Sequence, residues 1–310
     1  MNDLAVKVHK LIVAINKGDI DSVRAGFVDK ATWWVDTGND REIGASKGIP
    51  DTATNWPLHG RVSIDTKLLR QAEIESHWKR RPALQPNRIF SGEDWAVIEA
   101  ESYGINGQGR IYNNRHALVI HFQEQRIDSI SEYYDTLHAA DLYQTSLGKR
   151  THVLDLNLTP ACMQPHNKEE EVAARFFDSL NQVDLETVTS LFHTDATWWT
   201  DTGSNRAAGR QDEEAKPGHS WSLHGTLPIG KKLRAMENMP SAFPKGLSVI
   251  PTGYYSSPPY VAVEAFSHGE FISGHLYQNR YLWLFLIRDQ RISSLREYND
   301  TAHVVEIFGP

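Results

Sequence analysis

Residues 31–38 read Ala-Thr-Trp-Trp-Val-Asp-Thr-Gly, and residues 196–203 repeat this stretch as Ala-Thr-Trp-Trp-Thr-Asp-Thr-Gly, 165 positions later. An array of small helical repeats has a period of roughly 20–50 residues and at least three copies. Two long copies at a constant offset instead predict the duplication of a whole domain. Further motifs share this offset, namely Leu58-His59-Gly60 with Leu223-His224-Gly225, Asn114-Arg115 with Asn279-Arg280, and Asp135-Thr136 with Asp300-Thr301.

The length of the chain agrees with this duplication. With 310 residues, 40% of them hydrophobic, each copy is long enough to bury its own core. We expect a first domain at 1–146, a linker at 147–168 and a second domain at 169–310. The linker assignment rests on Pro160, Pro165 and weak hydrophobic periodicity.

Charge, cysteine content and motifs exclude several classes of protein. The net charge of −7 leaves no basic stripe for nucleic acid, and no apolar run approaches the ~18 residues of a membrane span. The single cysteine, Cys162, cannot form an intramolecular disulfide, so we expect a cytoplasmic protein. Glycine-rich nucleotide-binding motifs are absent and the 14 histidines are scattered, so we expect neither a cofactor nor a metal.

Each copy begins with helical periodicity and continues with strand-like alternation. Apolar residues at helical spacing predict a first helix, and Asp19 and Asp184 are placed to begin a second. Helices first and antiparallel strands later indicate the α+β class, in which helices cover one face of a curved sheet. Short helices are expected at 66–74 and 231–236, and strands at 95–103, 111–122, 126–134, 259–268, 275–288 and 290–299.

The motifs resemble those of SnoaL-like proteins, which belong to the nuclear-transport-factor-2-like (NTF2-like), ketosteroid-isomerase-like superfamily. The likeness covers 4–143 and 169–308. It implies two tandem cone-shaped α+β barrels, each a curved antiparallel sheet wrapped around helices that leaves a deep apolar pocket. The motifs that carry it are Ala-Thr-Trp-Trp, Pro57-Leu58-His59-Gly60, Tyr277-Gln278-Asn279-Arg280-Tyr281 and Arg296-Glu297-Tyr298-Asn299-Asp300-Thr301.

The resemblance also carries expectations about activity and assembly. Enzymes of this superfamily include isomerases, cyclases, dehydratases and other lyases, commonly without a cofactor. Many members pair through the outer face of the sheet. A tandem chain can make that pair internally, as a pseudo-dimer, or between chains, as a homo-oligomer.

Alternation along the strands selects the side chains expected to face the pocket, because residues two apart share a face. A carboxylate among aromatic walls is expected to have a raised pKa and to exchange a proton near neutral pH. The candidate catalytic residues are Glu132, Glu297, Glu99, Glu264, Asp135, Asp300, His138, His303 and His268. The candidate substrate-binding residues are Trp33, Trp34, His59, Tyr112, Asn114, His116, Trp198, Trp199, His224, Tyr277, Asn279 and Tyr281.

Several of these candidates have a structural alternative. The glutamates can form ion pairs with arginine, the aspartates can cap the terminal helix, and one tryptophan of each pair can belong to the core. The proton-shuttling aspartate of ketosteroid isomerases aligns with Val35 and Thr200, while Asp36 and Asp201 come one residue later. Steroid isomerisation by that arrangement is therefore not expected, and the two aspartates are second-tier candidates.

The expected function is cofactor-independent acid/base catalysis by an isomerase, dehydratase, cyclase or other lyase. Its substrate would be a small hydrophobic, oxygenated metabolite such as a polyketide, terpenoid, steroid or aromatic compound. Glu132 or Glu297 is expected to carry the proton, and the second copy to do more of the work, because Glu264, His268 and Tyr281 keep more of the family pattern. The alternative is a non-catalytic binding or assembly protein that uses the same pocket.

Overall fold

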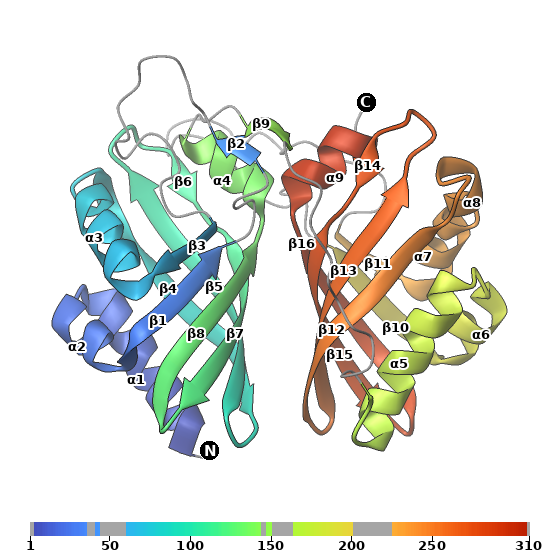
Figure 1. Cartoon of the computed structure of the whole chain (residues 1–310), viewed down its shortest axis with the longest axis horizontal. Helices are drawn as coiled ribbons and strands as arrows, with labels where there is room; N and C mark the ends of the chain where they lie inside the picture. The colour runs from blue at the N-terminus through green and yellow to red at the C-terminus, as the bar shows by residue number, and fades with distance from the viewer. Residues whose placement is uncertain are drawn as a thin grey trace. The chain divides into compact units, whose positions relative to one another are not determined.

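A computed structural model of the protein describes residues 3–35, 41–43, 60–143, 147–150, 164–200 and 225–308. Its elements fall into two compact units, which Figure 1 shows and which are taken separately below. Among the described helices, none is both long and apolar enough to cross a membrane.

The two units have nearly the same order of elements. Unit one consists of α1 (Asp3–Lys17), α2 (Ile20–Ala25), β1 (Phe27–Val35), β2 (Arg41–Ile43), β3 (Gly60–Ser63), α3 (Ile64–Glu75), β4 (Trp78–Ser91), β5 (Trp95–Asn106), β6 (Ile111–Tyr112), β7 (Arg115–Gln123), β8 (Arg126–Tyr134), α4 (Thr136–Tyr143) and β9 (Leu147–Arg150). Unit two consists of α5 (Lys168–Asn181), α6 (Leu185–Ser190), β10 (Phe192–Thr200), β11 (Gly225–Pro228), α7 (Ile229–Met236), α8 (Met239–Ala242), β12 (Leu247–Ser257), β13 (Tyr260–Glu270), β14 (Leu276–Tyr277), β15 (Arg280–Arg288), β16 (Arg291–Asn299) and α9 (Thr301–Phe308). The first four residues of the expected linker form β9, which pairs with β2.

The predicted helix starts are confirmed. Asp19 caps α2 by accepting a hydrogen bond from the Ser22 backbone N–H at 3.0 Å. Asp184 caps α6 in the same way, by accepting from the Thr187 backbone N–H at 3.0 Å. Each carboxylate satisfies a backbone donor that the first helical turn leaves without a partner. The same cap at the same position of both copies turns the chain from the first helix into the second.

The α+β class is confirmed, and each large sheet is antiparallel except for one parallel pair of strands. The strand order is β3-β1-β8-β7-β5-β4 in unit one and β11-β10-β16-β15-β13-β12 in unit two. β1 runs parallel to β8, and β10 parallel to β16. In unit one, β7 and β8 form an antiparallel hairpin. β8, the last strand of the sheet along the chain, then pairs with β1, the first. In each unit the first helices cover one face of the bent sheet (Figure 1).

The long strands β4 and β12 were not predicted. β4 contains Pro82 and Pro86, and β12 contains Pro251, residues that argue against a central strand because they cannot donate to the ladder. Both strands lie at the edge of their sheet, and their pairing shifts register just after Pro86 and Pro251. Prolines are accommodated at an edge and at a bulge, which explains why local sequence concealed these strands.

An asparagine ties the first helix of each unit to this edge strand, and we predict that its loss destabilises the fold. The Asn16 amide donates to the Leu84 carbonyl at 2.8 Å and accepts from its N–H at 2.7 Å, and Asn181 does the same with Val249. Asn16→Ala should lower the free energy of unfolding by about 1–3 kcal/mol, measured by urea denaturation. Unchanged midpoints in both Asn16→Ala and Asn181→Ala would contradict this.

Candidate active site

A pocket opens on the inner face of the unit-one sheet, between the sheet and helices α1 and α3. It holds about 800 Å³ of empty space, counting its open mouth. Half of the lining side chains are aromatic or aliphatic and half are polar or charged, so the walls offer both apolar surface and hydrogen-bonding groups to a small molecule. The lining residues are Ile15, Trp33, Lys67, Gln71, Glu75, Trp78, Arg81, Pro82, Leu84, Ser102, Tyr112, His116, Leu118 and Glu132.

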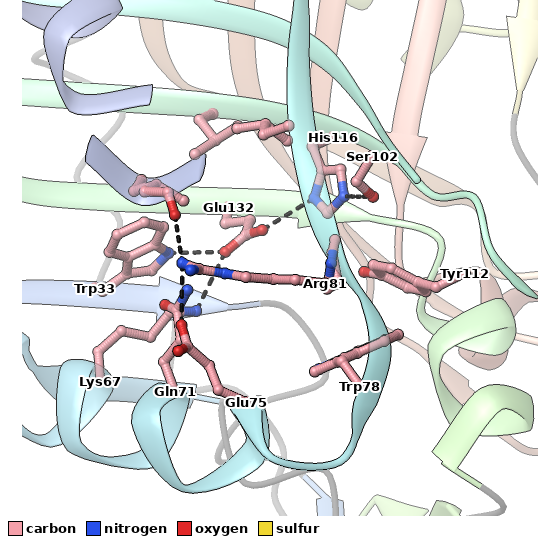
Figure 2. Close-up of a pocket in the computed structure, with 14 residues that line it drawn as sticks. Trp33, Lys67, Gln71, Glu75, Trp78, Arg81, Ser102, Tyr112, His116 and Glu132 are labelled. Carbon is pink, nitrogen blue, oxygen red and sulfur yellow. Dashed lines mark hydrogen bonds and ion pairs between the residues drawn. The ribbon is translucent and has the colours of Figure 1, made fainter. Parts of the chain in front are cut away.

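Glu132 is the polar centre of this pocket (Figure 2). Its Oε1 lies 3.0 Å from His116 Nδ1, and its Oε2 accepts a hydrogen bond from Trp33 Nε1 at 2.8 Å. Lys67 Nζ lies 3.5 Å from the same Oε2. Strands β1, β7 and β8 and helix α3 therefore bring these four side chains together, and three of the four were predicted.

The electrostatics of Glu132 overturn the role predicted for it. Burial alone would raise the pKa of this carboxyl, but the Lys67 charge, the hydrogen bond and positive charge of a protonated His116, and the hydrogen bond from Trp33 outweigh it and lower the pKa to about 2. The expectation of a raised pKa is wrong, because the residues that bury Glu132 also neutralise its charge. An ionised carboxylate of this kind orients a neighbouring base and is too weak to serve as the base itself.

His116 is the side chain that this carboxylate orients. An ionised Glu132 only accepts hydrogen bonds, so the ring nitrogen facing it, Nδ1, carries the proton. In the neutral imidazole, Nε2 then holds the lone pair, and Ser102 Oγ lies 2.8 Å from it inside the pocket. Ser102, His116 and Glu132 therefore form a hydrogen-bonded chain. In this chain His116 Nε2 is the proton acceptor on the pocket side.

The low pKa of Glu132 predicts acid sensitivity of unit one. Since folding lowers this pKa from 4.5 to about 2, the ionised group stabilises the fold above pH 4.5, and this stabilisation disappears as the pH falls towards 2. It can amount to roughly 3 kcal/mol. Urea denaturation at several pH values within this window should show the loss, and Glu132→Gln should have a flatter profile. Equal losses in both proteins would contradict the assignment.

The face predicted for β5 and β13 is wrong. Glu99 pairs in register with Ala117, which lies on the face opposite His116, and it forms an ion pair with Arg88 at 3.1 Å. Glu264 lies at the equivalent position and accepts a hydrogen bond from the Tyr255 hydroxyl at 2.8 Å. His268, on the same face as Glu264, is exposed and contacts Gln278.

The physical reason is that this strand is buried on both faces. Ala96, Val97 and Ile98 are each at most 1% exposed, so hydrophobic alternation does not distinguish the pocket face. Only the register with β7 does. Ser102, and not Glu99, is the polar side chain that β5 directs into the pocket.

Each tryptophan pair splits between the two faces. Trp33 lines the pocket, whereas Trp34 packs edge-on against Tyr133 on the other face, with ring centroids 5.2 Å apart. In unit two, Trp198 bonds Glu297 at 2.8 Å, whereas Trp199 packs against Tyr298 at 5.0 Å. Trp34 therefore does not line the described pocket of unit one, and Trp199 lies on the face of its strand opposite Trp198.

The asparagines and aspartates predicted for the site hold the chain where a strand ends. Asn114 and Asn279 interrupt the strands expected to run through them, and neither lines the pocket. The Asn114 amide donates to the Asp135 carbonyl at 3.0 Å and accepts from the Asp135 N–H at 3.1 Å, and Asn279 bonds Asp300 in the same way. Asp135 and Asp300 accept from the N–H groups of His138 and His303, as helix caps do.

His138 and His303 lie behind the pocket wall. Each stacks on a tyrosine, His138 on Tyr112 at 5.6 Å and His303 on Tyr277 at 5.2 Å. Tyr112 itself lines the pocket, as predicted. The histidines therefore support the tyrosine. The remaining candidates, His59, His224, Asp36 and Asp201, lie outside the described residues.

Unit two keeps the carboxylate cluster but has larger aromatic side chains beside it. Glu297 contacts Trp198, Lys232 and Thr200, yet Tyr281 replaces His116 and Trp283 replaces Leu118. The Trp283 ring packs against Phe176, Phe177 and Trp198 with centroids 5.3–5.7 Å apart. Polar residues at the mouth of the first pocket, Gln71, Glu75 and Arg81, are replaced by Met236, Pro240 and Gly246.

Tyr281 cannot replace the imidazole as a base. Burial raises its pKa well above the ordinary value, and the neighbouring Tyr277 and Glu297 raise it further. Its hydroxyl instead shares hydrogen bonds with Tyr277 at 2.7 Å and Ser267 at 3.3 Å. The expectation that the second copy does more of the work thus loses its basis, because Glu264 and His268 face elsewhere and Tyr281 remains protonated.

Sequence reasoning missed most of the residues that line the pocket, including two that contact the Glu132 cluster, Lys67 and Ser102. Both recur at the 165-residue offset, as Lys232 and Ser267, and a lysine within the apolar pattern of a helix is a further signal. Elsewhere, no three His, Cys, Asp or Glu side chains in the described part of the chain are grouped as a metal site requires.

Comparisons place these units among known folds. No family model matches the chain, and no curated protein matches it. Similar solved structures include an NTF2-like protein of unknown function from Burkholderia pseudomallei, at 13% identity, 46% of this chain, 99% of that chain and a TM-score of 0.38. IdmH from Streptomyces antibioticus, a candidate polyketide cyclase, has 19% identity, 46% and 100% coverage and a TM-score of 0.36.

A third solved structure is from Catenulispora acidiphila. It has a ketosteroid isomerase-like fold and is in complex with trimethylamine, with 15% identity, 45% and 92% coverage and a TM-score of 0.34. These are proteins of the superfamily that the sequence motifs resemble. Each of these three structures covers slightly less than half of the chain.

Proposed function

We propose that unit one is an acid/base enzyme that acts, without a cofactor, on a small hydrophobic, oxygenated metabolite. The observation that carries this proposal is the hydrogen-bonded chain Ser102–His116–Glu132 inside a pocket that combines apolar walls with hydrogen-bonding groups. Imidazole can accept and return a proton near neutral pH, and a carboxylate behind it holds the reactive tautomer. The reaction class is isomerisation, dehydration, cyclisation or another lyase reaction, all of which can begin with one proton transfer.

The pocket residues have separate roles in this proposal. His116 Nε2 is the proton acceptor, Glu132 orients the ring, and Ser102 lies where it can pass a proton between Nε2 and the substrate. The Tyr112 hydroxyl, on the same wall, is available to a developing enolate oxygen. Aromatic and aliphatic walls suit a polyketide, terpenoid, steroid or aromatic skeleton. One of the similar structures is a candidate polyketide cyclase, whose substrate class falls within this range.

Proton exchange in heavy water tests the proposal without knowledge of the natural substrate. Hydrophobic ketones that fit the pocket should exchange hydrogen for deuterium at the α-carbon faster with the protein than in buffer, as measured by NMR. The rate should saturate with ketone concentration and fall when a bound competitor is added. Saturable binding of these ketones with no catalysed exchange would instead support the alternative, a non-catalytic binding protein.

A further inference from the structure

Lys67 is a buried amine that the acid/base scheme does not use. It extends from α3 into the pocket and is 5% exposed. Its Nζ lies 4.5 Å from the centroid of the Trp33 ring and 3.5 Å from Glu132 Oε2 (Figure 2). An ammonium group has three N–H donors, and within the described residues this long carboxylate contact is its polar interaction. Among the described residues, no other acceptor takes up the donor capacity that Lys67 has on the pocket side.

Unit two contains a natural comparison for this lysine. Lys232 occupies the equivalent position, 4.8 Å from the Trp198 ring and 3.5 Å from Glu297 Oε2. Its Nζ also donates to Thr200 Oγ1 at 2.8 Å. Unit one has Val35 where unit two has Thr200, so Lys67 lacks the short acceptor that Lys232 has, while burial lowers the pKa of both lysines. Both units therefore place a lysine amine beside a tryptophan and a glutamate. In unit two this amine also donates to Thr200, whereas in unit one it faces the pocket.

Lys67 is an ammonium at rest beside the ionised Glu132, and burial makes it easier to deprotonate than an exposed lysine. Burial lowers the pKa of Lys67 below its ordinary value, and the Glu132 charge only partly opposes this. The neutral amine formed by deprotonation is a nucleophile towards carbonyl carbon. His116 lies across Glu132 from Lys67, so a proton acceptor and a nucleophile share one carboxylate.

We propose that Lys67 forms an imine with a ketone or aldehyde substrate in the pocket of unit one. The proposal rests on the proposed function, because it names the carbonyl class of substrate for the same site. The amine nitrogen bonds to the carbonyl carbon, and the carbonyl oxygen leaves as water with both hydrogens of the neutral amine. A proton then converts the imine to an iminium ion.

The iminium ion accounts for the chemistry of the neighbouring base. It withdraws the electron pair of an adjacent C–H bond, or of a C–C bond next to a β-hydroxyl, while His116 accepts the released proton. Reprotonation of the resulting enamine at carbon restores the iminium ion. Water then hydrolyses it to the free amine and the product carbonyl, so no oxidant or reductant is consumed.

Reductive trapping tests this proposal on the full chain. The protein is incubated with 4-phenylbutan-2-one and sodium cyanoborohydride, which converts an imine to a stable secondary amine, and the adduct is located by peptide mass mapping. We expect Lys67 to be labelled at least about tenfold more than Lys232 or exposed lysines. Lys67→Arg should remove this adduct, and Lys232→Arg should retain it. Because the map of the wild-type protein needs no variant, the test does not depend on the folding of Lys67→Arg.

The outcomes separate this proposal from the proposed function. Labelling of Lys67 no greater than that of exposed lysines overturns the imine, and catalysed α-carbon exchange in the same sample then leaves the acid/base function standing. Selective labelling of Lys67 without catalysed exchange supports the imine and contradicts the acid/base function.

Discussion

Glu132→Gln is expected to lower the rate of catalysed α-carbon exchange by about 10²–10⁴. Glutamine keeps the shape of the side chain but removes the charge that holds the proton on Nδ1 of His116. The ring can then present the wrong tautomer to the pocket, and Lys67 loses its counter-ion. NMR measurement of the exchange rate checks the loss, with ligand affinity measured in parallel to show that the pocket is still formed.

Glu297→Gln is the matched control for this variant. Glu297 has the same tryptophan and lysine neighbours, but Tyr281 stands where unit one has His116. We expect the exchange rate to stay within about twofold of wild type. Full activity in Glu132→Gln would remove this glutamate from the mechanism, and an equal loss in both variants would show that both units contribute.

Leu118→Trp is expected to abolish ligand binding by unit one. Leu118 lines the pocket at the position where unit two has Trp283, so the indole should occupy the space that a substrate needs. A loss of affinity of at least about a hundredfold corresponds to roughly 3 kcal/mol, and calorimetric titration with a pocket-binding ketone measures it. Circular dichroism should confirm that the protein stays folded, as unit two does with this residue.

Trp283→Leu is the reverse exchange. Removing the ring leaves Phe176, Phe177 and Trp198 without their common packing partner, so unit two should lose about 2–4 kcal/mol of unfolding free energy. It should gain no exchange activity, because Tyr281 still replaces the imidazole.

For Leu118→Trp, tight ketone binding that is retained would place the binding site elsewhere than in the pocket of unit one.

Local patterns in the sequence predicted the parts of the fold that local interactions form. The duplication was visible in the constant offset, and Asp19 and Asp184 marked helix starts because a cap needs only residues within one turn. Alternation on β7 and β8 correctly placed His116 and Glu132 on one face, but it left open which of Trp33 and Trp34 joins them. The side chains that meet at Glu132 were therefore largely predictable.

The tertiary structure decided the roles that those residues take. A strand buried on both sides has no alternation to read, so only the register of β5 against β7 shows that Ser102, and not Glu99, faces the pocket. The charge state of Glu132 depends on Lys67, 65 positions earlier in the chain. The sequence by itself determined the repeat at a constant offset, the α+β class and three of the four side chains, Glu132 included, that meet at this carboxylate. Packing between distant segments decided which carboxylate is paired, which imidazole contacts it and which side chains line the described pocket, because burial and charge pairing arise only when those segments meet.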